Sequence, residues 1–148
     1  MASRWYTRME AGWTADVTAL VDARYPYPAK DMQGNVLAFH DSKGLKVAFI
    51  YNRCSPPDIC IHVVAREGAL WCHEDILAHV FAYPFGQLEL GRCTVPVLSG
   101  NEASKRMVEA LGFVYEGTLR RAGPGDQDIL LYGILREECR WFNERKAA

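Results

Sequence analysis

The chain has 148 residues and a mass of 16.7 kDa, a length at which one domain buries about two-thirds of its unfolded surface. Hydrophobic residues make up 49% and charged residues 24%, which is close to the globular average and excludes extended disorder. The formal net charge of −1 and the pI near 6.4 give no general attraction for nucleic acid or an anionic membrane. We therefore expect one soluble domain over residues 1–148.

Cysteine usage and the N-terminal segment indicate a cellular compartment. The five cysteines are odd in number and widely spaced, unlike the dense pattern of a small disulfide-rich scaffold. The start, MASRWYTRMEAGW, carries charges where a signal peptide has an apolar stretch, and no run of about eighteen apolar residues follows. We expect reduced thiols, a cytoplasmic location and no membrane segment.

The first half of the chain predicts one helix followed by three strands. Apolar residues at roughly helical spacing predict a short helix over residues 15–25, which the Pro-Tyr-Pro sequence ends. Residues 35–40 and 45–51 are apolar and β-branched runs joined by Asp-Ser-Lys-Gly, a sequence typical of a hairpin turn. After a Ser-Pro-Pro break, residues 59–65 form an apolar run typical of a buried strand.

The middle of the second half predicts a helix on either side of a strand. A 3.6-residue apolar stripe begins at His73, and Pro84 should kink or end this helix because proline has no N–H for the carbonyl of Val80. Residues 92–98 read as a strand. The next helix begins at Asn101, and Gly112 suits its C-terminal cap.

The last part of the chain predicts a hairpin and a terminal helix. Residues 113–121 and 128–135 are strand-like runs around Gly-Pro-Gly-Asp, and residues 137–146 carry alternating Arg and Glu typical of a solvated helix. The order of elements indicates an α+β (mixed α/β) fold of mostly antiparallel strands with inserted helices and no internal repeats.

The most specific pattern lies between Asn101 and Arg120, which read NEASKRMVEALGFVYEGTLR. An Asn-x-x-Ser helix start is followed by the string LGF-x-x-EG-x-LR. This pattern resembles the C-terminal half of the GCN5-related N-acetyltransferases (GNAT superfamily), and particularly the branch that acetylates protein N-termini, ribosomal proteins and small amines. The resemblance covers about residues 36–136. It implies a central, mostly antiparallel sheet with a splayed strand pair, acetyl-CoA as co-substrate, and an amine acceptor that is a protein, peptide or small molecule.

The resemblance also implies a set of cofactor-binding residues. The strand over residues 59–65 corresponds to the one that receives pantetheine, with N–H groups near Val64 as oxyanion donors. The loop over residues 66–73 corresponds to the one that wraps the pyrophosphate, since N–H groups at a helix start bind phosphate oxygens. Asn101 matches the family's cofactor-contacting asparagine, and Ser104 its proposed acid for the CoA thiolate. The implied cofactor-binding set is Val63, Val64, Ala65, Arg66, Gly68, Ala69, Trp71, His73, Asn101 and Ser104, with Ser104 also catalytic.

The pyrophosphate loop departs from the family pattern of Gln or Arg, two residues, Gly, one residue, then Gly or Ala. Arg66 is present, but Ala69 and Trp71 occupy the two positions of the small residues. Either the loop turns around residues 71–74, or the phosphate cradle is damaged. Trp71 could instead cover the adenine or seal the pocket.

Two further features have a structural and a functional interpretation. Pro96 removes a ladder hydrogen bond, so it belongs either where the two central strands separate or in a simple edge strand. Glu116 is the glutamate of the family motif, and its spacing from Arg120 favours a salt-bridged strand face. Position 123, where the ribosomal-protein branch has a glutamate, is a glycine. His73 and Glu74 are weaker candidates, and the sequence names no general base.

The remaining cysteine and histidine pairs give weak signals. Cys72 beside His73 has no orienting third residue for a thiol nucleophile. Cys60 and His62 share a strand face but lack the second pair of ligands that a metal site needs, so we expect no metal.

Two functions fit these residues. The first is an acetyl-CoA-dependent N-acetyltransferase that transfers the acetyl group directly to an amine. The second is a catalytically inactive protein of the same fold that binds another protein, which the altered loop and the missing base favour. Short family members occur in bacteria and resemble proteins of tailed phages. Residues 25–33 and 53–57 are the loops expected to select the acceptor, and the sequence does not predict the oligomeric state.

Overall fold

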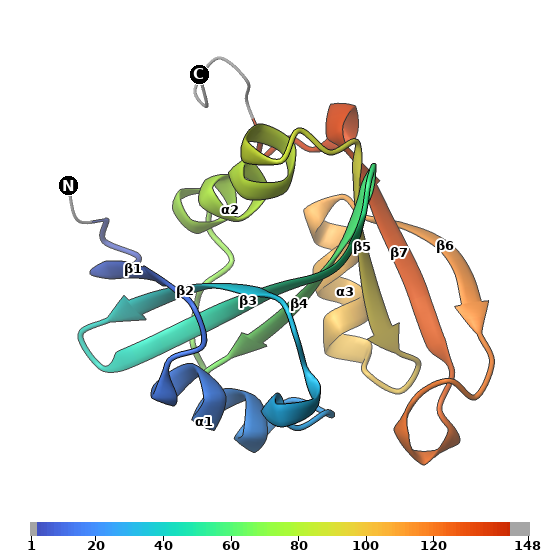
Figure 1. Ribbon diagram of the computed structural model, residues 1–148, viewed down its shortest axis with the longest axis horizontal. Coiled ribbons are helices and arrows are strands. Elements are labelled where there is room, and N and C mark those ends of the chain that lie inside the picture. The colour runs from blue at the N-terminus through green and yellow to red at the C-terminus, as the bar shows by residue number, and fades with distance from the viewer. Residues whose placement is uncertain (1–2, 143–148) are drawn as a thin grey trace.

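The computed structural model describes residues 3–142, which form a seven-stranded sheet of order β1-β2-β3-β4-β5-β7-β6 (Figure 1). Neighbouring strands are antiparallel except β4 and β5, which are parallel. The mixed α/β fold with a mostly antiparallel sheet is therefore confirmed. The strands are β1 (Arg8–Ala11), β2 (Asn35–Asp41), β3 (Gly44–Ser55), β4 (Asp58–Ala65), β5 (Arg92–Leu98), β6 (Val114–Leu119) and β7 (Ile129–Leu135).

Helices cover both faces of this sheet. One core cluster joins α1 to β2, β3 and β4 through side chains such as Val17 and Ile50, and the other joins the opposite face to α2 and α3 through side chains such as Phe49 and Val108. The two clusters alternate along β2 and β3, as the two-residue period of a strand requires. The helices are α1 (Ala15–Arg24), α2 (Glu74–Phe81) and α3 (Glu102–Leu111), with short 3₁₀ turns at Ala29–Asp31, Pro124–Asp126 and Arg136–Glu138.

The α2 helix confirms the effect expected of Pro84. The α-helix ends at Phe81 and continues as a π-helix over Ala82–Gln87, in which Leu88 N–H donates to the carbonyl of Tyr83 at 2.9 Å. Pro84 cannot donate to the carbonyl of Val80. The buried hydroxyl of Tyr51 on β3 donates to that carbonyl instead, at 2.6 Å.

The prediction of a terminal helix over residues 137–146 is wrong for the residues that the structure describes. Only a single 3₁₀ turn forms at Arg136–Glu138, and residues 143–146 lie outside the part of the chain that is described. Several side chains of this segment bond to carbonyls of other elements. Arg136 donates to the carbonyl of Phe85 at 2.6 Å, Arg140 donates to that of Ala110 at 2.6 Å, and the indole of Trp141 donates to that of Leu111 at 2.9 Å.

The first strand, β1, is absent from the sequence prediction. It pairs with β2 at the edge of the sheet and is mostly exposed; even Met9 is 45% exposed. An edge strand with little buried surface lacks the apolar alternation by which strands are recognised.

Candidate functional site

The two central strands β4 and β5 separate almost immediately. They share one pair, Cys60 with Thr94, whereas β4 stays paired with β3 as far as Ala65 and β5 with β7 as far as Leu98. Figure 1 shows the two strands diverging toward their C-terminal ends. The splayed pair predicted from the family resemblance is therefore present, and the main chain beyond Cys60 and Thr94 has no ladder across the gap.

Pro96 lies beside this gap. Pro96 is paired with Leu131 of β7, and β5 lies between β4 and β7 in the sheet. β5 is therefore a central strand, and the edge-strand interpretation is wrong. A proline is tolerated in a central strand where the neighbour on one side has moved away, because no ladder hydrogen bond is lost there.

The start of α3 has the predicted cap. Asn101 precedes the helix, and its Oδ1 accepts from the N–H of Ser104 at 3.1 Å. Ser104 is half-buried in the first turn, and Gly112 ends the helix at φ +103°, a value that favours glycine. The two residues implied for the cofactor and for thiolate protonation therefore share one turn, which follows directly from β5.

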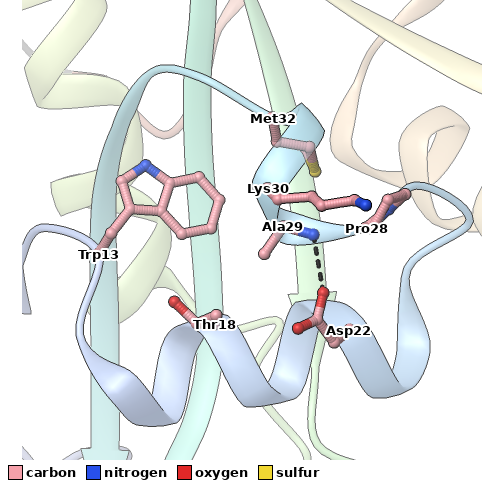
Figure 2. A pocket seen from close by; sticks show the side chains of 7 residues that line it. All are labelled: Trp13, Thr18, Asp22, Pro28, Ala29, Lys30 and Met32. Atoms are coloured by element: carbon pink, nitrogen blue, oxygen red, sulfur yellow. Dashed lines mark hydrogen bonds between the residues drawn. The ribbon is translucent and has the colours of Figure 1, made fainter.

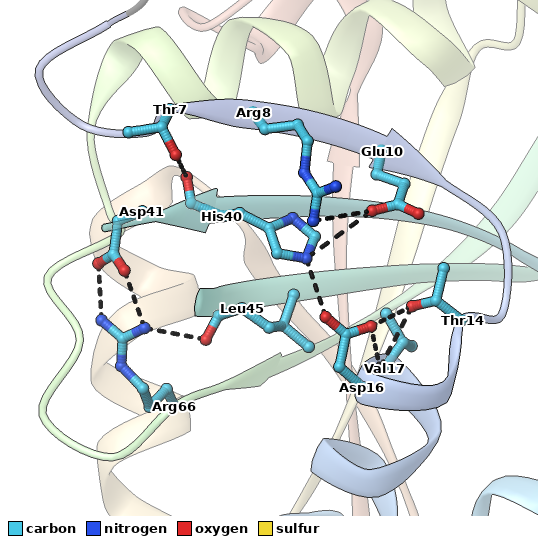
Figure 3. Close-up of polar contacts among 10 residues, drawn as sticks. All are labelled: Thr7, Arg8, Glu10, Thr14, Asp16, Val17, His40, Asp41, Leu45 and Arg66. Atoms are coloured by element: carbon cyan, nitrogen blue, oxygen red, sulfur yellow. Dashed lines mark hydrogen bonds and ion pairs between the residues drawn. The ribbon is translucent and has the colours of Figure 1, made fainter. Parts of the chain in front are cut away.

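The loop predicted to hold pyrophosphate makes polar contacts with β2 and β3 and within itself. Arg66 pairs with Asp41 through both guanidinium nitrogens, at 3.0 and 2.6 Å, and also donates to the carbonyl of Leu45 (Figure 3). Hydrogen bonding from Arg66 lowers the pKa of Asp41 to about 2. The N–H of Ala69 donates to Arg66 and that of His73 to Trp71 within the loop. The Arg66 guanidinium and the N–H groups of Ala69 and His73 are thus already hydrogen-bonded within the protein.

The side chains of Trp71 and His73 contact other side chains of the protein. The Trp71 indole is buried and packs against Phe49 of β3, with ring centroids 5.4 Å apart. His73 caps α2 by accepting from the N–H of Asp75 at 3.2 Å, and its ring stacks on Trp5 at 4.1 Å. The fold gives Trp71 a core role that its sequence position did not reveal.

An N-terminal arm, residues 3–7, covers the start of α2. Ser3 donates to the carboxylate of Asp75 at 2.7 Å, and the hydroxyl of Tyr6 contacts the ring of His79 at 3.0 Å. Lys46 donates to the carbonyl of Trp5 at 2.8 Å. The first turn of α2 also carries two acidic residues, Glu74 and Asp75, and like charge opposes the binding of a phosphate there.

Three of the other implied residues, Val63, Val64 and Ala65, lie on β4. Val64 is buried among the side chains that face α1, whereas Val63 and Ala65 are half-buried against the opposite cluster. Gly68 forms the turn after β4 at φ +74°, a value that favours glycine.

A half-buried histidine beside the gap makes contacts that the sequence did not predict. His62 lies two residues beyond Cys60 on β4; its Nε2–H donates to Asn52 Oδ1 at 2.9 Å, and its Nδ1 accepts from the Tyr25 hydroxyl at 2.6 Å. Asn52 is oriented by a further bond to the carbonyl of Gln33. Burial lowers the pKa of His62 to about 4 and raises that of Tyr25, so both side chains are neutral near pH 7.

The thiols and acidic side chains give no other catalytic arrangement in residues 3–142. Burial raises the pKa of Cys60 and of Cys72, which disfavours the reactive thiolate. His73 bonds to Asp75 rather than to Cys72. Within the same residues, no three His, Cys, Asp or Glu side chains are placed to hold a metal ion, and no helix is long and apolar enough to cross a membrane.

An open hollow of about 630 Å³ lies beside α1 (Figure 2). Asp22 on α1 accepts from the N–H of Ala29, which joins the helix to the returning chain at the floor of the hollow. This segment belongs to the loop expected to select the acceptor. The lining residues are Trp13, Thr18, Asp22, Pro28, Ala29, Lys30 and Met32.

Comparison with solved structures identifies the fold. A protein assigned as an acetyltransferase from T. thermophilus is 24% identical over 70% of this chain and 60% of its own, with a TM-score of 0.61. A mutant of the spermidine/spermine N-acetyltransferase SpeG from Vibrio cholerae is 17% identical over 88% of this chain and 94% of its own, with a TM-score of 0.71. This chain thus spans less than two-thirds of the T. thermophilus protein. No family model and no curated protein sequence matches it.

These similarities, all below 25% identity, define the class of fold, which is that of the GNAT N-acetyltransferases. The neighbours include a polyamine acetyltransferase as well as proteins assigned only as acetyltransferases. The strand divergence and the Asn-capped helix after β5 are two features of this chain that agree with the predicted fold.

Proposed function

We propose that this protein is an acetyl-CoA-dependent N-acetyltransferase that moves an acetyl group directly to an amine of a protein, peptide or small molecule. The observation that carries the proposal is the single pair between β4 and β5, after which the strands diverge. A parallel pair with one contact leaves main-chain groups on both strands without partners from the neighbouring strand, and such groups require hydrogen-bonding partners. An extended amide chain such as pantetheine supplies them.

The acyl end of the cofactor fits the residues better than the phosphate end. Val63, Val64 and Ala65 would hold the pantetheine, with Asn101 and Ser104 at the start of α3 on the side of β5. Bound acetyl-CoA would supply the activated thioester. At the other end, the Arg66 guanidinium is paired with Asp41 and the N–H groups of Ala69 and His73 are bonded within the loop. The phosphates would therefore be held less tightly than the pantetheine.

His62 and Tyr25 are our candidates for removing the amine proton. Tyr25 oxygen can accept a proton from the amine while its own hydroxyl proton passes to Nδ1 of His62, along the existing 2.6 Å contact. Burial keeps His62 neutral, so Nδ1 is available as an acceptor. Ser104 is the candidate acid for the departing thiolate because its hydroxyl lies in the first turn of α3.

Ligand-dependent melting tests the cofactor. Acetyl-CoA at millimolar concentration should raise the Tm, because a ligand present at 100 times its Kd adds about 2.7 kcal/mol to the native state. Adenosine 3′,5′-bisphosphate, which lacks the pantetheine, should raise it less. Transfer is then followed by mass spectrometry with a panel of peptide N-termini, small amines and spermidine, the last because one fold neighbour acts on it. Ser104→Ala should lower turnover and largely spare the affinity for acetyl-CoA.

The second candidate function is a protein-binding module without catalysis. The acidic, arm-covered start of α2 and the engaged Arg66 favour it, since these features oppose phosphate binding. An unchanged Tm with acetyl-CoA would support this function and remove the transferase. Under either function, five free cysteines favour a reducing, cytoplasmic compartment, in a bacterium or a phage-infected cell.

A further inference from the structure

The backbone provides few bonds between the two halves of the sheet. Besides the pair of Cys60 with Thr94, the carbonyl of Pro57 accepts from the N–H groups of Gly91 and Arg92, at 3.1 and 3.2 Å. All these contacts lie at the closed end of the gap. Side chains must therefore hold the strands at a defined separation, because a few backbone bonds at one end leave the angle between the strands free to vary.

A cluster of polar side chains lies at that closed end. The Thr94 hydroxyl, on a residue only 8% exposed, donates to the Asp58 carboxylate, 2.8 and 2.9 Å from its two oxygens. The same hydroxyl accepts from the guanidinium of Arg92 at 3.1 Å. Arg92 Nε is 3.3 Å from Asp58. Asp58 belongs to β4 and the other two residues to β5, so the cluster joins the two halves of the sheet.

Arg92 extends the cluster across the second half of the sheet. Its guanidinium pairs with Glu116 of β6 at 2.5 Å. The pair lies over Gly133 of β7, where a Cβ atom would stand 2.5 Å from Glu116 Oε1. Glycine at position 133 therefore leaves room for the ion pair, and the guanidinium of Arg92 links β4 to two strands, β5 and β6.

We propose that Asp58, Thr94 and Arg92 form a clamp that sets the opening between β4 and β5 and so positions both walls of the proposed cofactor gap. The three residues are positioning residues and take no part in the chemistry. The clamp stands on the geometry of the closed end alone, and only its effect on the cofactor rests on the proposed function.

Removing the Thr94 hydroxyl tests the clamp without changing the shape of the side chain. In Thr94→Val, amide exchange measured by NMR should accelerate about tenfold at Ile61–Ala65 and at Val95, Val97 and Leu98, the factor expected from losing one hydrogen bond to a charged group. Thr94→Ser keeps the hydroxyl and should exchange like the wild type. Val21→Ala, in the α1 cluster, is the control for a general loss of stability. Equal acceleration in the Val21 and Thr94→Val variants, or none in the latter, would overturn the clamp.

A second pair of variants acts on the outer arm of the clamp. Gly133→Ala should displace the Arg92–Glu116 pair and accelerate exchange in the same segments, whereas Gly117→Ala, which meets nothing within 4 Å, should not. Unchanged exchange in Gly133→Ala would show that the outer arm does not support the clamp.

The cofactor arm of the test separates the clamp from the proposed function. The Kd for acetyl-CoA should rise about tenfold in Thr94→Val and stay unchanged in Thr94→Ser and Val21→Ala, since only the first loses the bond to Asp58. If the wild type binds no acetyl-CoA, the proposed function fails and the exchange results alone decide the clamp. If it binds and Thr94→Val binds equally well, the positioning role is wrong.

Discussion

The two strands that border the gap are each followed by a helix, β4 by α2 and β5 by α3, and the starts of these helices differ in what already occupies them. At α3 the cap is the neutral Asn101, and the acidic Glu102 is paired with Lys105 at 2.6 Å. At α2 the cap is His73, two carboxylates lie in the first turn, and the arm of residues 3–7 covers the turn. A helix start is an anion site only when its N–H groups and its surroundings are free, so the two starts are not equivalent.

The largest expected effect concerns the loop that leads into α2. Trp71→Ala should lower the free energy of unfolding by about 3–5 kcal/mol, because the buried indole leaves a cavity against Phe49. Urea denaturation measures the loss. Leu70→Ala, at a neighbouring side chain that is 76% exposed, is the matched control and should change little. A loss of less than about 1 kcal/mol for Trp71→Ala would show that the indole is not a core side chain. It would then favour the alternative in which Trp71 covers the adenine.

The pH dependence of stability tests His62, beside the gap, independently of the start of α2. Because the pKa of His62 falls from 6.5 to about 4 on folding, the unfolded chain binds a proton between these values and the folded chain does not. Stability should therefore be unaffected by this group above pH 6.5 and should fall as the pH drops toward 4, by about 3 kcal/mol at most. Denaturation at several pH values measures the slope.

Two variants show which group causes the slope. His62→Gln should flatten the slope, whereas Asp75→Asn at the start of α2 should keep it. A slope that persists in His62→Gln would assign the effect to other groups and would count against His62 as a neutral proton acceptor.

The α3 start gives a smaller effect. Asn101→Ala removes the oxygen that accepts from Ser104 N–H and should cost about 1 kcal/mol of stability, while Asn101→Asp should preserve the cap. If Asn101 also contacts the cofactor, Asn101→Ala should raise the Kd for acetyl-CoA more than its loss of stability alone explains. Unchanged affinity in Asn101→Ala would restrict Asn101 to capping.

The smallest effect concerns charge at the α2 start. Replacing Asp75 with Asn should tighten acetyl-CoA binding a few-fold at low salt, because one charge near a helix terminus contributes about 0.3–1 kcal/mol. Glu137→Gln, an exposed residue of the 3₁₀ turn after β7, serves as the control for net charge. Isothermal titration measures both, and equal tightening in the two variants would mean that only net charge acts.

The sequence predicted those parts of the fold that depend on local pattern. The period of α2, the caps of α3 and the apolar runs of β3 and β4 each carry their own signal. The edge strand β1 and the end of the chain do not, because β1 buries little and Arg136, Arg140 and Trp141 bond to distant carbonyls.

The candidate site was less predictable, because its contacts join distant residues. Tyr25 and His62 meet across 37 positions, and no local pattern reports such a contact. Simple alternation favoured Arg120 as the partner of Glu116. A register shift between Tyr115 and Gly117 interrupts that alternation, and Glu116 pairs with Arg92 of β5 instead. Its predicted structural role is retained with a different partner.

The bond from Tyr51 to Val80 has a consequence for how the molecule could accommodate a ligand. It fastens the last turn of α2 to β3 where Pro84 leaves a carbonyl without its usual donor, and the stacking of Trp5 on His73 fastens the opposite end. A helix anchored at both ends cannot slide along the sheet to make room. Any ligand that binds beside α2 must therefore displace the arm of residues 3–7 or fit against α2 in its present position.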